Sequence, residues 1–290
     1  MFSGCGTALI TPFKKDGKID KRGLRALVDF QESEGADAIV PCGTTGESAT
    51  LTHEEHLKVI EIVVDQVEKA KVIAGAGSNA THEAIKLSRG AQNLGAAGIL
   101  SISPYYNKPT QRGIFEHYEA IAGSIDIPLI VYNVPSRTSS NIDVSTVLKL
   151  AKVPNIVGIK EASGNITQIM SLLAQAPKGF TVLSGDDAFT FPMMAMGARG
   201  VISVASNVVP RMVKDMTGHL LAGDLEGART LHFRLLPLFK NLFIETNPIP
   251  VKTAVRLMGK PAGPFRLPLC DMDPANLEVL KRTLVDLGVI

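Results

Sequence analysis

Short apolar runs alternate with amphipathic segments along the first three quarters of the chain. The runs are rich in β-branched residues and are bounded by glycine, proline and asparagine, which is typical of buried strands. Eight such runs occur, at residues 7–12, 38–42, 72–76, 98–103, 128–134, 156–162, 181–184 and 200–205. Between them, apolar residues recur at helical spacing, as at Leu24, Leu27 and Val28. The alternation predicts parallel βαβ units.

Local signals mark several helix ends. Thr52 followed by Glu55 predicts a capping box at the start of the second helix. Gly35, Gly95 and Gly197 fall where helices are expected to end, since glycine readily adopts the left-handed conformation there.

The number of units indicates the fold class. Eight βαβ units in about 220 residues match an α/β protein of the (β/α)8 or TIM-barrel type, which typically has about 250 residues. An open doubly wound sheet usually has fewer strands. It is further disfavoured because no G-x-G-x-x-G turn follows the first strand.

The pattern changes after residue 222. Helical segments are predicted at 225–242, 250–258 and 274–287, with no strand between them, and the proline-rich stretch 247–250 separates the first two. We therefore expect a catalytic barrel at 1–222 and a C-terminal helical extension at 223–290. A separate small domain is the alternative, although no Ser/Gly-rich linker precedes this region.

Composition narrows the functional classes. The 290 residues are 45% hydrophobic and 20% charged, with a net charge of +2. This balance indicates a folded core. The net charge is too small to create an electrostatic field that would attract nucleic acid or an anionic membrane. Three scattered cysteines argue against a disulfide framework or a zinc cluster. With no signal peptide and no apolar stretch of about 18 residues, a cytoplasmic enzyme is expected.

Lys160 lies in the apolar run 156–162. A buried ammonium is costly, and burial favours the neutral amine, which attacks carbonyl groups. The alternative is that Lys160 lies at the strand end and extends its amine to water.

Other polar residues follow the predicted strands, where barrels place their active sites. The stretch 43–48, with Thr44 and Thr45 between glycines, predicts either an anion-binding nest or an ordinary glycine turn. Tyr132 precedes Arg137, which either binds a carboxylate or lies on the surface. The adjacent tyrosines 105 and 106 either pack within a loop or serve the site.

Two aspartates end the seventh strand. Asp186 and Asp187 suggest a metal, but no further ligand has suitable spacing, so helix N-capping is favoured. Without a metal set or a phosphate loop, the polar residues suit Schiff-base chemistry on a small carboxylated carbonyl compound. In that chemistry Lys160 forms the imine, Tyr132 moves protons and the nest holds a carboxylate.

Three motifs carry a family resemblance. The sequences GTTGESATL at 43–51, YNVPSRT at 132–138 and GIKEASGN at 158–165 closely resemble those of the dihydrodipicolinate synthase family. The resemblance runs from Thr7 to Lys252. N-acetylneuraminate lyase and sugar-acid dehydratases or aldolases of the same superfamily share the lysine and the tyrosine. The ending Ser136-Arg137-Thr138 and the full string 43–51 are similar to the synthase rather than to those relatives.

The resemblance implies a reaction. Pyruvate forms an imine with Lys160 and then an enamine, which attacks the aldehyde of L-aspartate 4-semialdehyde, and the product cyclises and leaves the lysine. The family needs no cofactor and no metal. It forms homotetramers built as dimers of dimers.

The resemblance also implies roles for individual residues. The proton relay comprises Tyr132, Thr44 and Tyr106, the last supplied by a neighbouring subunit. Thr45 corresponds to the pyruvate-carboxylate site and Arg137 to the site for the semialdehyde's carboxylate. Gly185 and Ile202 correspond to positions whose backbone lines the same pocket.

A second site is implied around residues 53–56. The histidines of the sequence HEEH resemble metal ligands, but their i, i+3 spacing without a third ligand favours a solvated helix start. The resemblance instead implies a regulatory site at which L-lysine inhibits, and we expect it at a subunit interface. It comprises Ser48, Ala49, His53, His56, Asn79, Glu83 and Tyr105. Two alternatives to the synthase remain: a related pyruvate lyase acting on sugar acids, and a non-catalytic barrel that binds a keto acid.

Overall fold

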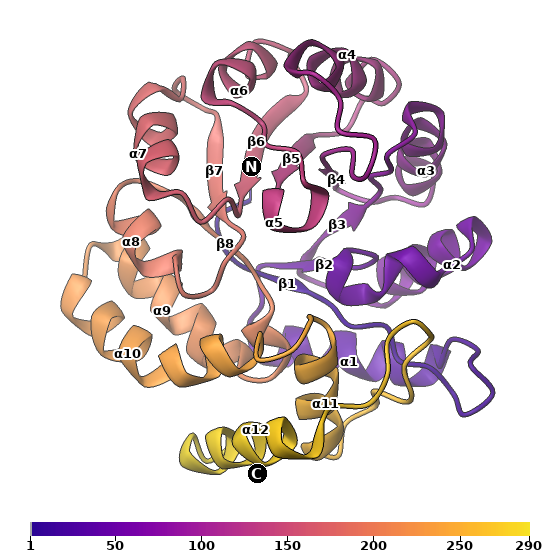
Figure 1. The fold of residues 1–290 in the computed structure, drawn as a ribbon, viewed down its shortest axis with the longest axis vertical. Helices are drawn as coiled ribbons and strands as arrows, with labels where there is room; N and C mark the ends of the chain where they lie inside the picture. The colour runs from indigo at the N-terminus through magenta and orange to yellow at the C-terminus, as the bar shows by residue number, and fades with distance from the viewer. Residues whose placement is uncertain (1) are drawn as a thin grey trace.

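Eight parallel strands form a closed barrel surrounded by helices (Figure 1). The computed structural model describes residues 2–290. The strands follow one another around the barrel in sequence order, and β1 pairs with β8 to close it. Their bounds are β1 Gly4–Ala8, β2 Ala38–Val40, β3 Lys71–Gly75, β4 Gly98–Ile102, β5 Leu129–Asn133, β6 Ile156–Glu161, β7 Thr181–Ser184 and β8 Gly200–Ser203. The predicted (β/α)8 fold is confirmed.

The predicted position of the first strand is wrong. Strand β1 covers Gly4–Ala8, whereas the apolar pattern placed it at 7–12. Its glycines add nothing to a hydrophobic signal, while Leu9 and Ile10 beyond its end are fully buried and extend that signal. The amide of Ile10 donates to Asn207 Oδ1 at 3.1 Å instead of to a neighbouring strand. The other seven strands lie within two residues of their predicted bounds.

Helices follow the strands as expected. They are α1 Lys21–Ser33, α2 His53–Gln66, α3 Thr81–Asn93, α4 Gln111–Ala122, α5 Pro135–Thr138, α6 Val144–Leu150, α7 Ile166–Gln175, α8 Thr190–Ala195 and α9 Pro210–Ala222, with short 3-10 turns η1 Thr44–Gly46, η2 Ser48–Thr50 and η3 Ala205–Asn207. The capping box of Thr52 and Glu55 is present at α2. Gly35, Gly95 and Gly197 have positive φ angles just beyond α1, α3 and α8, as predicted.

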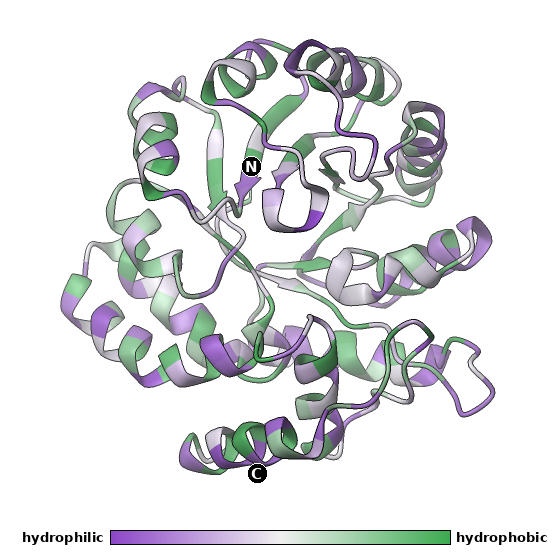
Figure 2. Cartoon of the chain, in the orientation of Figure 1, coloured by the Kyte–Doolittle hydropathy of each residue, from purple (hydrophilic) through white to green (hydrophobic). Residues whose placement is uncertain are grey.

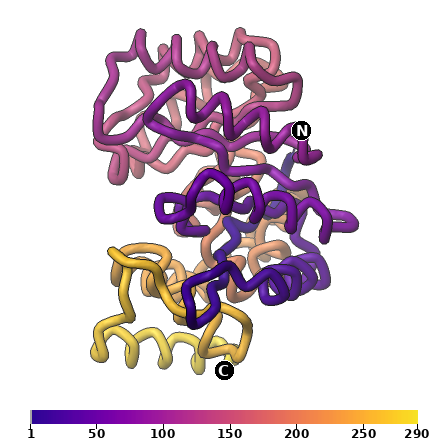
Figure 3. The backbone as a smooth tube through the Cα atoms, turned by 90° about the vertical axis from the view of Figure 1, so that its right-hand side faces the viewer, coloured from indigo at the N-terminus to yellow at the C-terminus, as the bar shows by residue number. Residues whose placement is uncertain are grey.

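The C-terminal region is helical, with α10 Leu225–Asn241, α11 Ile249–Leu257 and α12 Pro274–Asp286. Helix α10 packs against α9 and α12, and Figure 3 shows the yellow C-terminal segments at one end of the molecule. The segment after α11 contacts the N-terminal part of the chain, where Phe13 N donates to Ala262 O at 3.2 Å. The division into domains 1–222 and 223–290 stays a prediction.

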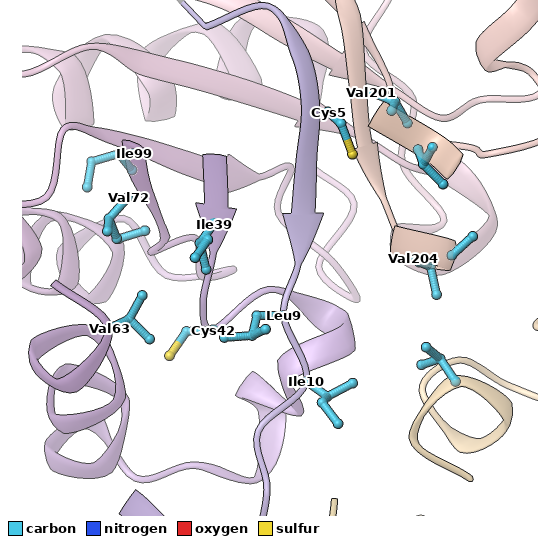
Figure 4. Close-up of a cluster of buried hydrophobic side chains, with 14 of the residues drawn as sticks. Cys5, Leu9, Ile10, Ile39, Cys42, Val63, Val72, Ile99, Val201 and Val204 are labelled. Atoms are coloured by element: carbon cyan, nitrogen blue, oxygen red, sulfur yellow. The ribbon is translucent and has the colours of Figure 1, made fainter. Parts of the chain in front are cut away.

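The apolar residues form two clusters on either side of the strands. The larger lies between the strands and the helices, where Figure 4 shows Ile39, Val63, Val72 and Ile99 among its members. The smaller fills the barrel interior and includes Ile130, Tyr132, Leu183 and Ile202. In Figure 2 the strands are predominantly green, as expected for strands buried on both faces.

Side chains alternate between these two clusters along each strand. In β5, Leu129 and Val131 belong to the outer cluster, whereas Ile130 and Tyr132 belong to the inner one. In β6, Ile159 belongs to the outer cluster, so Lys160 is directed into the barrel. None of the helices in the described part of the chain is both long and apolar enough to cross a membrane.

Candidate active site at the carboxyl end of the barrel

Lys160 and Tyr132 are the central pair of the candidate site. They are register partners on β6 and β5, and Lys160 Nζ lies 4.2 Å from the centre of the Tyr132 ring. Lys160 is only 5% exposed, so its side chain does not extend along the surface. Both residues line one cavity of about 970 Å³ that also includes Thr44, Thr45 and Arg137. The structure therefore brings together five residues predicted from three separate motifs.

Burial changes the chemistry of the lysine. Desolvation lowers the pKa of Lys160 to about 7; the Asp187 carboxylate opposes this shift, and the Arg137 guanidinium adds to it. In a substantial fraction of the molecules, Lys160 therefore carries a neutral amine at neutral pH. That form is the nucleophile needed to attack a carbonyl carbon.

Tyr132 has the opposite property. Burial raises the pKa of its phenol to about 12, although the nearby Arg137 charge works in the other direction. The phenol therefore stays protonated at neutral pH. Next to the Lys160 amine, it is placed to donate or relay a proton.

Polar contacts outside the barrel hold these two strands in register. The residues after Tyr132 and Lys160 are Asn133 and Glu161, and Asn133 Nδ2 donates to Glu161 Oε2 at 3.0 Å. Glu161 Oε1 accepts from Ser163 N at 2.6 Å, and Asn133 Oδ1 accepts from Ile142 N at 3.0 Å. This buried network fixes the positions of Lys160 and Tyr132 relative to each other along the barrel axis. Asn133 and Glu161 lie inside the motifs YNVPSRT and GIKEASGN, but the sequence does not show that their side chains pair with each other.

The loop after β2 carries Thr44 and Thr45. Thr45 is 2% exposed, and its hydroxyl accepts a hydrogen bond from Asn247 Nδ2 at 3.0 Å. Behind the loop, Glu47 has a positive φ of 56° and forms an ion pair with Lys252 of α11, with both side chains fully buried. The C-terminal extension thus supports the loop directly. Sequence reasoning missed this support.

Position 185 requires a glycine, because the Lys160 side chain packs too closely against it to leave room for a Cβ atom. A Cβ atom at this position would lie 2.7 Å from the Ala162 Cβ and 3.0 Å from the Cε and Cγ atoms of Lys160. The residue lines the cavity, as expected. Ile202 lies in the fully buried inner cluster with Tyr132 rather than on the cavity wall.

The predicted capping role of the two aspartates is wrong. Helix α8 begins at Thr190, after an N-cap residue, Phe189, that makes no side-chain capping bond. Asp187 Oδ2 instead accepts from the amides of Val204 and Ala205, both at 2.9 Å, and so joins the segments that follow the adjacent strands β7 and β8. Asp186 Oδ1 accepts from Ala188 N at 2.9 Å. Only the backbone carbonyls of the two aspartates reach the first residue of α8, where they accept from Thr190, so neither carboxylate caps the helix.

A family model matches most of the chain. The model of the dihydrodipicolinate synthetase family matches residues 1–287. The chain belongs to this family.

Relatives of this family resemble the chain over its whole length. The 4-hydroxy-tetrahydrodipicolinate synthase of Syntrophus aciditrophicus is 52% identical over 291 residues, which cover 100% of each protein. Among solved structures, the synthase from Cyanidioschyzon merolae with lysine bound is 43% identical, with a TM-score of 0.97 over 100% of this chain and 99% of that one. The chloride-inhibited synthase from Acinetobacter baumannii, complexed with pyruvate, is 41% identical, with a TM-score of 0.97 over 100% of both chains.

The residues that the family resemblance assigns to lysine regulation mostly share the cavity of Lys160. Those lining it are Ser48, Ala49, His53, His56, Glu83 and Tyr105. Asn79 lies outside the lining and donates from Nδ2 to the Tyr105 carbonyl at 3.1 Å. His56 is 4% exposed with Nε2 2.6 Å from the Gly75 carbonyl, and burial lowers its pKa. Glu83 Oε2 accepts from the Ser78 hydroxyl at 2.7 Å.

Tyr106 does not reach Lys160 within its own chain. Its side chain is 88% exposed, its backbone has a φ of 73°, and it lies outside the cavity lining. A non-glycine residue at positive φ is uncommon and is held there at some cost. The tyrosine therefore projects away from its own barrel.

Proposed function

We propose that this member of the dihydrodipicolinate synthetase family is a lyase that condenses pyruvate with L-aspartate 4-semialdehyde through a lysine Schiff base. The product is 4-hydroxy-tetrahydrodipicolinate, an intermediate of lysine and diaminopimelate biosynthesis. The observation that carries the proposal is the buried Lys160 amine over the Tyr132 ring, in a cavity that also contains Thr45 and Arg137. Relatives that are more than 50% identical over the full length are 4-hydroxy-tetrahydrodipicolinate synthases, which supports the assignment of these substrates to this chain.

The reaction begins at the neutral amine of Lys160. Nζ attacks C2 of pyruvate, and loss of water forms the imine; a methyl proton then leaves to give the enamine. The enamine carbon attacks the aldehyde carbon of the semialdehyde, and the new alkoxide takes up a proton. The substrate ammonium then loses a proton, and the resulting amine attacks the imine carbon, closes the ring and releases Lys160 as an amine.

The remaining residues bind and move protons. Tyr132 and Thr44 carry protons between the reacting atoms and solvent. Thr45 binds the carboxylate of pyruvate, and Arg137 binds that of the semialdehyde. Gly185 leaves room for the Lys160 side chain, and Ile202 packs with Tyr132 in the barrel interior behind the pocket.

We also propose that Tyr106 completes the relay of a neighbouring subunit, within a homotetramer built as a dimer of dimers. The exposure of its side chain and its positive φ angle support a role outside its own barrel. Regulation by L-lysine at the residues around His56 and Glu83 is a further proposal. The lysine-bound relative from Cyanidioschyzon merolae supports it.

Borohydride trapping tests the Schiff base. Pyruvate plus borohydride is expected to add a reduced pyruvyl group at Lys160 and to inactivate the protein. No adduct, or an adduct at another residue, would reject the mechanism and favour a non-catalytic barrel.

Substrate turnover separates the synthase from its lyase relatives. The synthase consumes pyruvate only when aspartate semialdehyde is present. A sugar-acid lyase instead releases pyruvate from N-acetylneuraminate or 2-keto-3-deoxygluconate. Turnover of either sugar acid without semialdehyde condensation would overturn the assignment.

A further inference from the structure

Asn247 joins the C-terminal extension to both predicted carboxylate-binding side chains. It precedes α11, lines the cavity and is 5% exposed. Its Nδ2 donates to Thr45 Oγ1 at 3.0 Å, and its backbone carbonyl accepts from Arg137 Nη2 at 3.4 Å. No motif of the sequence analysis assigned it a role.

The amide oxygen of Asn247 lacks a donor. Within residues 2–290 no group donates to Oδ1, although the atom is buried. A buried acceptor without a partner costs free energy, so each one needs an explanation. Because Asn247 lines the substrate cavity, the explanation that fits is a donor supplied by the substrate.

Of the two substrates, only one carries a nitrogen donor. Pyruvate has no N–H group, whereas the semialdehyde has an α-ammonium on the same carbon as the carboxylate assigned to Arg137. Arg137 touches the Asn247 backbone, so binding of that carboxylate brings the ammonium close to the Asn247 side chain.

We propose that Asn247 determines specificity for the amino aldehyde, with Oδ1 accepting a hydrogen bond from its α-ammonium while Nδ2 holds Thr45. The inference rests on the proposed function. Glu47 is a poor alternative acceptor, because it is paired with Lys252 and fully buried. Asp186 also lines the cavity, so it is the competing acceptor in the test.

The test compares two aldehydes that differ only in the amino group. The KM for aspartate semialdehyde and the inhibition constant of succinic semialdehyde, which lacks the amine, are measured for the wild type, Asn247→Ala and Asn247→Asp. The measured quantity is the KM for aspartate semialdehyde divided by the inhibition constant of succinic semialdehyde. Loss of a hydrogen bond to a charged group is expected to raise this ratio about tenfold or more in Asn247→Ala. Asn247→Asp keeps an acceptor oxygen and adds charge, so the ratio falls below that of the wild type.

Thr45→Val provides the matched control. It removes the hydroxyl that Asn247 holds, so any change it causes affects both constants by the same factor. Equal shifts of both constants in Asn247→Ala would overturn the proposal and leave Asn247 acting only through Thr45 and Arg137. A ratio that responds to Asp186→Asn but not to Asn247→Ala would assign the ammonium to Asp186.

Two further measurements make the outcome decisive. Pyruvate trapping by borohydride reports whether each variant retains a folded site. Where Asn247→Ala fails to trap, Asn247→Asp carries the test, and an unchanged ratio in that variant counts against the proposal. A wild-type protein that never consumes aspartate semialdehyde would instead reject the proposed function itself.

Discussion

The amine of Lys160 lies 4.2 Å from the centre of the Tyr132 ring because the two residues are register partners on adjacent strands. Tyr132 brings a phenol that stays protonated, and Lys160 brings an amine that loses its proton near neutral pH. Burial causes both shifts, since it disfavours the charged form of each group. One strand pairing therefore sets a nucleophile beside a proton donor.

The rate of imine formation is expected to follow the protonation of Lys160. Because burial lowers the pKa of Lys160 to about 7, the reactive neutral fraction rises with pH through that value and levels off above it. Rapid-quench borohydride trapping of pyruvate is expected to be roughly tenfold faster at about pH 8 than at about pH 6. Lys160→Ala, the control, forms no adduct. A rate that is flat over this range, or that rises only near pH 10, would contradict a buried amine.

Gly185→Ala tests the space around the lysine. The added Cβ would meet Lys160 and Ala162 at 2.7–3.0 Å, so the lysine side chain must move. We expect kcat to fall about a hundredfold or more and the free energy of unfolding to fall by about 1–3 kcal/mol. Gly218→Ala is the matched control, because within residues 2–290 its added Cβ would meet no atom within 4 Å apart from its chain neighbours and the backbone of its own helix. Full activity in Gly185→Ala would show that the lysine position tolerates displacement.

Complementation tests the origin of the tyrosine that completes the relay. Tyr106→Phe and Lys160→Ala are each expected to be nearly inactive alone. In a mixed dimer, the site that keeps Lys160 receives Tyr106 from the other subunit and regains activity. Co-expression with two affinity tags isolates the mixed oligomer for assay. Failure to recover activity would assign Tyr106 to the site of its own chain, whereas full activity of Tyr106→Phe alone would show that it has no catalytic role.

Strand periodicity predicted the barrel because its strands are buried on both faces and read as continuous apolar runs. Glycines hid the start of β1, since they contribute no hydropathy. Residues at the strand ends, such as Lys160, were identifiable because the fold places them at one mouth. The partners of Thr45 and Glu47 were not, because Asn247 and Lys252 lie 202 and 205 residues away along the chain. Local patterns carry no information about such pairings.

The proposed feedback by L-lysine depends on Glu83. The Glu83 carboxylate lines the cavity and has the charge to pair with the ammonium of a bound lysine. Glu83→Gln is expected to raise the half-inhibitory lysine concentration at least about tenfold, through loss of a charge-assisted hydrogen bond, while kcat changes little. Initial rates against lysine concentration measure both. A wild-type inhibition curve that is flat to millimolar lysine would reject the regulatory site.

The buried pair of Glu47 and Lys252 links the stability of the extension to the catalytic loop. Lys252→Met leaves the Glu47 carboxylate unpaired in a site without solvent, so we expect the free energy of unfolding to fall by about 3–5 kcal/mol. Adding Glu47→Gln removes the unpaired charge. The double variant is therefore expected to recover more than half of the lost free energy of unfolding. Because Glu47 lies two residues after Thr45, the single variant is also expected to raise the KM for pyruvate. Urea unfolding and initial rates measure the two effects. A loss below about 1 kcal/mol in Lys252→Met would mean that the carboxylate takes up a proton or reaches water, and that the pair does not hold the loop.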